Sequence, residues 1–188
     1  MKYITGFFVL IWRIWMILLA AIYVLTIGVF IVLPLASFEK TFPYIYPLIR
    51  YWGKFVLYGT GFRIDYKKLV PLDPKENYVF IANHTSVMDI MLMLTILKHH
   101  PIVFVGKAEL LKIPIFGRIF ERICIPVDRK SARSKALVYP EAKKKLDKDL
   151  SIFIFPEGGV TNDKEFKIYL HRFKDGSFNS AIDAKNRV

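Results

Sequence analysis

The amino-acid sequence predicts an α/β fold, with a largely parallel sheet flanked by helices and an N-terminal membrane-embedded helical segment. Two observations lead to this prediction: an apolar run lies near the amino terminus of the 188-residue chain, and short β-rich runs alternate with helix-length segments farther on. Such alternation is typical of strands joined by helical crossovers, which run parallel. We expect residues 1–60 to form the membrane-associated segment and residues 61–188 to form one compact domain around the sheet.

The apolar run extends from Ile14 to Leu33 and contains twenty consecutive uncharged, mostly apolar residues. At about 1.5 Å per helical residue, it is long enough to cross the roughly 30 Å hydrocarbon core of a bilayer. Pro34 is expected to end the run, and Arg13 separates it from the apolar residues that begin at Ile4. A single crossing and a membrane-embedded hairpin both agree with this pattern. A cleaved signal peptide is disfavoured, because the run is too long and no small-x-small site follows it.

The aromatic-rich segment 42–62 could lie either at the membrane surface or under the following domain. Its mixture of aromatic side chains with Arg50 and Lys54 is typical of a segment at the level of lipid headgroups. A helix buried under the following domain would have a similar composition. The basic residues after the apolar run, Lys40 included, slightly outnumber Lys2 and Arg13 before it, which favours a domain on the cytoplasmic face of the membrane.

The β-rich runs predict four strands, at residues 78–82, 102–106, 123–127 and 151–155. The segment 130–149 is predicted to be helical, with Pro140 bending or dividing the helix. In parallel sheets the working groups gather at the carboxyl ends of strands. Three unusual strings begin at such ends: NHTSVMD, GKAELLKIP and PEGG. We therefore expect these strings to form a single site.

The charge of the chain points to an anionic partner, since 28 Lys and Arg against 16 Asp and Glu leave a formal charge of +12. Nucleic acid, a phospholipid surface and a phosphorylated metabolite all satisfy that requirement. No nucleic acid partner is expected, because the apolar run favours a membrane and no nucleic-acid-binding module is present. The single cysteine, Cys124, lies in an apolar stretch and is expected to pack rather than react. The histidines have no zinc-binding spacing, so we expect no metal.

His84 and Asp89 follow the first predicted strand, where two interpretations are open. Ser86 and Asp89 have the spacing of a capping box, so Asp89 could simply accept hydrogen bonds from the free N–H groups of a helix that runs to about Lys98. Alternatively, the ring of His84 folds back from the turn toward Asp89. A carboxylate on one ring nitrogen fixes the tautomer and leaves the other nitrogen as a base that activates an alcohol.

Other catalytic signatures are missing from the sequence. There is no G-x-S-x-G nucleophile elbow and no G-x-x-x-x-G-K phosphate loop, and GTGFRI does not complete G-x-G-x-x-G. If His84 is a base without an enzyme nucleophile, the acceptor alcohol itself must attack the acyl donor.

Three blocks of the chain resemble the phospholipid and glycerol acyltransferase family, especially its 1-acylglycerol-3-phosphate acyltransferases. The N-H-x-x-x-x-D block is matched by Asn83, His84 and Asp89; the second by Lys107, Leu110, Pro114 and Gly117, followed by Arg129; and F-P-E-G by Phe155, Pro156, Glu157 and Gly158. The string FKDGSF at residues 173–178 resembles the continuation of the third block. One block would be weak support, whereas three in order are strong support.

The resemblance implies transfer of an acyl chain from acyl-CoA or acyl-carrier protein to the free hydroxyl of a lysophospholipid, most simply 1-acylglycerol 3-phosphate. His84 would take the hydroxyl proton while Asp89 orients its ring. Lys107 and Arg129 would hold the acceptor phosphate. Asn83 belongs to the first block and is expected beside the substrate, and Glu157 and Gly158 would shape the acceptor pocket. The thioester is a co-substrate, and no cofactor is expected.

The sequence departs from the family pattern in two places. Gly159 and Val160 stand where the family usually has Thr and Arg, which leaves open an acceptor such as a lyso-aminolipid. The family also continues past Val188 into another strand with a fourth block, so we expect a carboxyl-terminally shortened domain without that final strand and motif. The second departure keeps open a membrane lipid-binding protein without turnover.

The segment 109–123 alternates apolar residues with Lys112, Arg118 and Arg122. This pattern suits a helix that rests on anionic lipid, and equally an amphipathic helix of the core.

Overall fold

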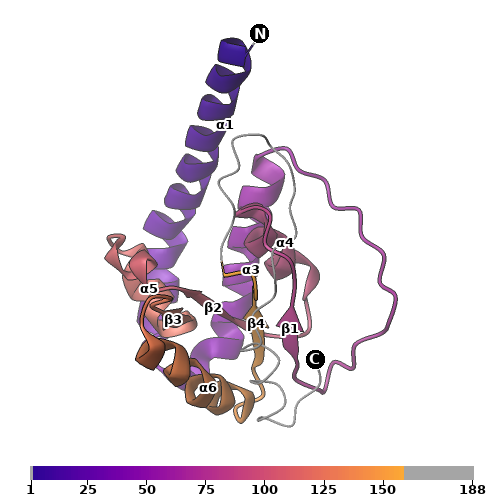
Figure 1. Cartoon of the computed structure of the whole chain (residues 1–188), viewed down its shortest axis with the longest axis vertical. Coiled ribbons are helices and arrows are strands. Elements are labelled where there is room, and N and C mark those ends of the chain that lie inside the picture. The colour runs from indigo at the N-terminus through magenta and orange to yellow at the C-terminus, as the bar shows by residue number, and fades with distance from the viewer. Residues whose placement is uncertain (1, 159–188) are drawn as a thin grey trace.

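The computed structural model describes residues 2–158, so the predictions for Gly159, Val160, residues 173–178 and the end at Val188 lie outside the described residues. The chain begins with one long helical rod (Figure 1). The rod comprises α1 (Lys2–Tyr23), the π-helical stretch η1 (Val24–Val32) and α2 (Leu33–Leu35). Within the described residues, one helix, Gly6–Leu35, is long and apolar enough to cross a membrane by length and composition alone.

The rod begins before the predicted apolar run, and it ends at Leu35, one residue after Pro34. Arg13 does not interrupt it, because a single charged side chain leaves the helical backbone unchanged. The backbone at Pro34 accommodates the missing N–H near this end of the rod. In the wider turn that precedes Pro34, the Leu33 N–H donates to the carbonyl of Gly28, and Pro34 follows as one of the first residues of α2. A missing N–H costs little at that position of a helix.

The aromatic-rich segment forms α3 (Phe42–Gly59), which follows the short 3₁₀ turn η2 (Glu39–Thr41). One face of α3 is buried, and its residues are Phe42, Ile45, Tyr46, Gly53, Val56 and Leu57. At Gly53 an added Cβ would lie 2.9 Å from the side chain of Leu94 and 3.2 Å from the carbonyl oxygen of Met91, so α3 and α4 (Met88–Ile96) pack closely there. The interpretation as a helix under the domain is therefore right for this face, whereas Tyr44 and Tyr51 are exposed on the other.

The sheet has the predicted parallel arrangement. Its described strands are β1 (Val79–Ile81), β2 (Ile102–Lys107), β3 (Ile125–Val127) and β4 (Ser151–Ile154), in the order β1-β4-β2-β3. The central strand β4 pairs in parallel with both β1 and β2, for example Phe153 with Phe80 and with Phe104. Because the strands run parallel, their carboxyl ends share one edge of the sheet.

Two element boundaries differ from the sequence prediction. Ile123 ends α5 (Phe116–Ile123) instead of starting a strand, since a short apolar run does not distinguish a strand from the end of a buried helix. Helix α6 (Ala132–Leu146) passes through Pro140 without dividing. Pro140 and Ala136, whose carbonyl loses its helical donor, are both exposed, so water can satisfy that carbonyl. The remaining short turn, η3 (Ala108–Lys112), links β2 to the segment before α5.

One apolar core joins the sheet to the helices. It contains fully buried strand residues such as Val79, Val103 and Ile152, together with Leu94 of α4 and Ala142 of α6. Helix α6 contacts β3 and β4, and the rod contacts α3 and α5. This packing fixes the positions of the turns that follow each strand.

Candidate active site

Residues from the ends of all four described strands meet at one cavity. His84 follows β1, Lys107 ends β2, Arg129 follows β3 and Gly158 follows β4. The cavity has a volume of about 630 Å³, and these four residues lie in its wall. The prediction of a single site at the carboxyl edge of the sheet is therefore confirmed in its geometry, while the catalytic and binding roles stay predictions.

His84 and Asp89 form a close pair. His84 lies in the turn before α4 and Asp89 in the first turn of α4, and Nδ1 of His84 is 3.2 Å from Oδ2 of Asp89. The side chains are 11% and 19% exposed, respectively. When Nδ1 carries the proton and donates to the carboxylate, Nε2 of the ring has its lone pair available to accept a proton. The arrangement can therefore supply a positioned base.

Asp89 also has the structural role that the capping interpretation predicts. Its Oδ2 accepts hydrogen bonds from the backbone N–H groups of Thr85, at 2.7 Å, and Ser86, at 2.8 Å. The Oγ of Ser86 accepts from the N–H of Met88 at 3.2 Å. One carboxylate oxygen thus holds the turn and contacts the histidine ring that the turn carries. The two interpretations of the sequence are compatible, because both use the same oxygen atom.

Two residues that follow the central strand support His84 from another direction. The imidazole stacks on the ring of Phe155, with centroids 4.0 Å apart and an interplanar angle of 18°. The backbone N–H of His84 donates to Oε1 of Glu157 at 2.9 Å. Phe155 is buried, so it forms a firm base for the ring. Glu157, which the resemblance places at the acceptor pocket, thus holds the backbone of the histidine turn.

The two predicted phosphate ligands differ in their surroundings. Lys107 is about half exposed and lies 3.3 Å from the carboxylate of Glu109. Arg129 is partly buried, and its Nη1 donates a hydrogen bond to the carbonyl of Gly158. Burial lowers the pKa of Arg129 from its usual value, and the nearby Glu109 carboxylate opposes that shift. The guanidinium nevertheless keeps its charge at any physiological pH, because its usual pKa exceeds about 12.

Gly158 and Asn83 complete the predicted set. Gly158 has φ +82°, a left-handed conformation that favours glycine, and it presents its carbonyl to Arg129. Asn83 is exposed in the turn before His84 and is not among the described residues that line the cavity. The structure therefore brings His84, Asp89, Lys107, Arg129, Glu157 and Gly158 together, and it leaves Asn83 at the outer side of the turn.

Most of the cavity wall is apolar. The side chains come from α3, α4, β2 and α5, and they include Ile49, Trp52, Leu94, Phe104, Phe116 and Phe120. Cys124 also lies in this wall, and burial raises the pKa of its thiol to about 12. A thiol with such a pKa stays protonated at neutral pH and is a poor nucleophile. The cavity can therefore hold an apolar chain with its polar end near His84.

Comparison with known proteins decides the family. Residues 63–188 match the acyltransferase family profile. The chain belongs to the acyltransferase family. The 1-acyl-sn-glycerol-3-phosphate acyltransferases of Escherichia coli (strain K12) and Salmonella typhimurium are similar to it, with 31% identity over 129 residues and 29% over 126 residues. Each match covers 66% of this chain and 49% of the relative, so the chain spans about half the length of these relatives.

Two further members of the acyltransferase family are informative. The lyso-ornithine lipid O-acyltransferase of Pseudomonas aeruginosa is 25% identical over 109 residues, which are 58% of this chain and 41% of that protein. The crystal structure of the 1-acyl-sn-glycerophosphate (LPA) acyltransferase PlsC from Thermotoga maritima matches with a TM-score of 0.70 and 26% identity. That match covers 98% of this chain and 72% of the other. The apolar rod is thus included in the structural likeness.

Sequence reasoning on this acyltransferase-family chain missed the roles of two aromatic residues. The sequence places Phe155 at the end of a predicted strand and in F-P-E-G, but it does not show that the ring lies under the imidazole. Trp52 lines the cavity from α3, outside every recognised block. The position of Phe155 at the end of a buried strand, next to the histidine turn, was a usable signal. Trp52 has no comparable signal in the sequence, because its position depends on how α3 packs.

Proposed function

We propose that this chain transfers an acyl group from a thioester to the free hydroxyl of 1-acylglycerol 3-phosphate, which yields phosphatidic acid. The observation that carries the proposal is the position of His84, paired with Asp89, in the wall of a largely apolar cavity that also contains two cationic side chains. A lysophospholipid has the matching chemistry, since it combines an apolar chain, a phosphate and an alcohol. The family and the names of the relatives point the same way.

The chemistry needs one base and no enzyme nucleophile. Nε2 of His84 takes the proton of the acceptor hydroxyl as the hydroxyl oxygen attacks the thioester carbonyl carbon. Asp89 stabilises the imidazolium that forms, because its carboxylate lies beside Nδ1. When the tetrahedral intermediate collapses, the carbon–sulfur bond breaks and the proton on Nε2 passes to the thiolate. The stack on Phe155 and the hydrogen bond from the His84 backbone to Glu157 limit movement of the base during both steps.

Substrate binding is assigned by charge and polarity. Arg129 and Lys107 bind the acceptor phosphate, and the apolar wall holds an acyl chain. The donor is acyl-CoA or acyl-carrier protein. The exposed apolar side chains of the rod, such as Phe7, Phe8 and Phe30, are covered by lipid, and the domain works at the membrane surface on its cytoplasmic face.

A second acceptor class is favoured by one comparison. The similarity to a lyso-ornithine lipid O-acyltransferase makes an acceptor without phosphate the alternative substrate. In that case the same base would act, and Arg129 would serve mainly to hold the carbonyl of Gly158. Replacement of Arg129 distinguishes the two acceptors, because only a phosphate depends on the planar guanidinium for paired hydrogen bonds.

The test is an acyl-transfer assay with the purified full chain in detergent micelles. Labelled acyl-CoA and acyl-carrier protein are each supplied with lysophosphatidic acid, lyso-ornithine lipid or glycerol 3-phosphate. We expect the highest kcat/KM with lysophosphatidic acid. Arg129→Lys should raise the KM for that acceptor about tenfold. The exposed control Arg133→Lys should leave it unchanged. Preference for lyso-ornithine lipid would support the alternative acceptor, and absence of transfer to every lysolipid would overturn the proposal.

A further inference from the structure

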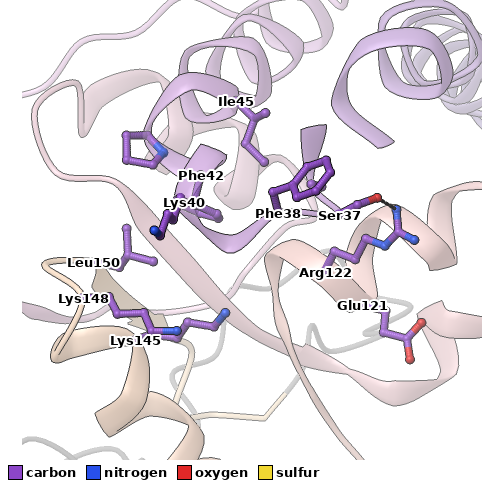
Figure 2. Close-up of a pocket in the computed structure, with 12 residues that line it drawn as sticks. Ser37, Phe38, Lys40, Phe42, Ile45, Glu121, Arg122, Lys145, Lys148 and Leu150 are labelled. Atoms are coloured by element: carbon purple, nitrogen blue, oxygen red, sulfur yellow. Dashed lines mark hydrogen bonds between the residues drawn. The ribbon is translucent and has the colours of Figure 1, made fainter. Parts of the chain in front are cut away.

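A second cavity lies away from the candidate active site. It is a groove of about 760 Å³ between the end of the rod, the start of α3 and the ends of α5 and α6 (Figure 2). Leu150 in its wall directly precedes β4, whereas His84 follows the end of β1. The groove is therefore near the amino edge of the parallel sheet, and the active-site cavity is at the carboxyl edge. The two cavities have no lining residue in common among the described residues.

The groove is strongly basic. Four cations line it from three different parts of the chain: Lys40 before α3, Arg122 in α5, Lys145 near the end of α6 and Lys148 just after α6. Glu121 is the one acidic residue of the described lining, so the net formal charge of the lining is +3. Cations that converge from separate elements repel one another, and an anion in the groove would relieve that repulsion.

The position of Arg122 is fixed by hydrogen bonds to the end of the rod. Its Nη1 donates to the carbonyl of Leu33 at 2.8 Å and to Oγ of Ser37 at 2.9 Å. Figure 2 shows this contact on one side of the groove and the three lysines on the other. The guanidinium thus connects the apolar rod to the basic groove. A ligand bound here would lie at the point where the lipid-facing surface of the rod ends.

The surface beside the cations is apolar and exposed. Phe38, which lines the groove, is 67% exposed, and Phe30 on the preceding turns of the rod is 76% exposed. Large apolar side chains next to a cluster of cations match an amphiphile that has an anionic head and hydrocarbon tails. A soluble phosphate would satisfy the cations and leave both rings in water. The combination therefore favours a phospholipid.

We propose that this groove binds the phosphate headgroup of an anionic membrane phospholipid while the tails of that lipid lie against the exposed end of the rod. The bound lipid is distinct from the acyl acceptor, and it holds the domain at a fixed orientation on the bilayer. The proposal rests on the membrane location proposed above and does not depend on acyl transfer.

The chain offers a matched pair of variants for the test. K145A/K148A removes two groove cations, Lys145 in α6 and Lys148 just after it. K143A/K144A removes two neighbouring cations of α6 that are outside the described lining of the groove and lie 3.0 Å from Asp147 and 2.7 Å from Glu141, respectively. Both double variants change the net charge of the chain by the same amount. A difference between them therefore reports on the groove and not on total charge.

The full chain in neutral detergent micelles is given equal amounts of phosphatidylglycerol and phosphatidylcholine, and the retained lipid is quantified by mass spectrometry. We expect wild type and K143A/K144A to enrich phosphatidylglycerol, and K145A/K148A to bind it about tenfold more weakly. Inorganic phosphate at constant ionic strength should not displace the lipid. Acyl transfer by K145A/K148A in the same micelles should remain at the level of wild type, so a failure of catalysis is separable from a failure of lipid binding.

Three results would overturn the proposal. Equal loss of phosphatidylglycerol in the two double variants would mean that diffuse charge attracts the lipid. Displacement by inorganic phosphate would assign the groove to a soluble anion. Unchanged lipid retention in K145A/K148A, with loss of transfer from acyl-carrier protein only, would assign it to an acidic protein partner.

Discussion

The imidazole of His84 lies nearly parallel to the ring of Phe155, with centroids 4.0 Å apart. Stacking fixes the plane of the imidazole, and the contact with Asp89 fixes its rotation in that plane. Together the two contacts leave Nε2 in one orientation. The aromatic residue at the end of β4 is therefore expected to affect catalysis without contacting substrate.

Phe155→Leu removes the stacking partner and keeps an apolar side chain. We expect kcat to fall about tenfold, because a base that samples several orientations is in position for less of the time. The matched control is Phe80→Leu, which alters a ring of β1 that packs against Phe153 and His100. Both variants should lower the free energy of unfolding by about 1–3 kcal/mol, and the unfolding midpoint should fall accordingly. Equal kcat values for the two variants would show that the stack has no role in catalysis.

Glu157 provides a second prediction, because its Oε1 accepts the N–H of His84. Glu157→Gln keeps an acceptor oxygen and should retain most activity. Glu157→Ala removes the acceptor and should lower both kcat and stability, the latter by about 1–3 kcal/mol for a partly buried donor left without a partner. Steady-state kinetics and thermal unfolding of the two variants test this expectation. If Glu157→Gln raises the KM of the acceptor as strongly as Glu157→Ala does, Glu157 binds substrate instead of holding the turn.

The sequence predicted the parallel sheet and the convergence of its carboxyl ends because both follow from alternating patterns and from the geometry of crossovers. The residues alone left open whether His84 approaches Asp89, and the resemblance to the acyltransferase family favoured the pair that the structure shows. The sequence did not predict Trp52 in the cavity wall, which depends on the close packing of α3 on α4 at Gly53. The sequence pattern also did not show that Pro140 is exposed, which allows α6 to continue through it without dividing.

Asp89→Asn separates the charge of Asp89 from its capping role. The amide oxygen can still accept the N–H groups of Thr85 and Ser86, so the unfolding midpoint should change little. The amide cannot stabilise an imidazolium as a carboxylate does, and kcat/KM should fall about 10²–10⁴-fold. Ser86→Ala is the control, since it removes the hydrogen bond to the N–H of Met88 and costs about 1 kcal/mol without altering Asp89. Loss of stability without loss of activity in Asp89→Asn would leave only the capping role.

The rod is expected to lie along one leaflet and not to cross the bilayer, because exposed apolar side chains occur along its length, from Phe7 and Phe8 to Phe30. Its contacts with the domain extend from Trp12, whose Nε1 donates to the carbonyl of Thr60, to Leu33 beside Arg122. Residues 2–11 of α1 precede Trp12, and Figure 1 shows this end of α1 projecting from the rest of the chain. Ten helical residues span about 15 Å, which is half of the hydrocarbon core.

A cysteine at position 6 in a Cys124→Ser background tests this depth, because an added side chain at Gly6 meets nothing within 4 Å. The protein is placed in sealed vesicles with its domain on the outside. An impermeant thiol reagent that is trapped inside the vesicles should not label the cysteine at position 6. A cysteine in place of the exposed Lys98 should be labelled from the outer side as the control. Labelling of position 6 from the inner side alone would show that the rod crosses the membrane.

The most direct test of the account is acyl transfer to lysophosphatidic acid by His84→Ala, compared with wild type and with the exposed-histidine control His99→Ala. Loss of the base should lower kcat by about 10²–10⁴-fold, with little change in the unfolding midpoint or in the KM of the donor. His99→Ala should behave as wild type. A well-folded His84→Ala variant that retains the turnover of wild type would contradict the assignment of His84 as the base.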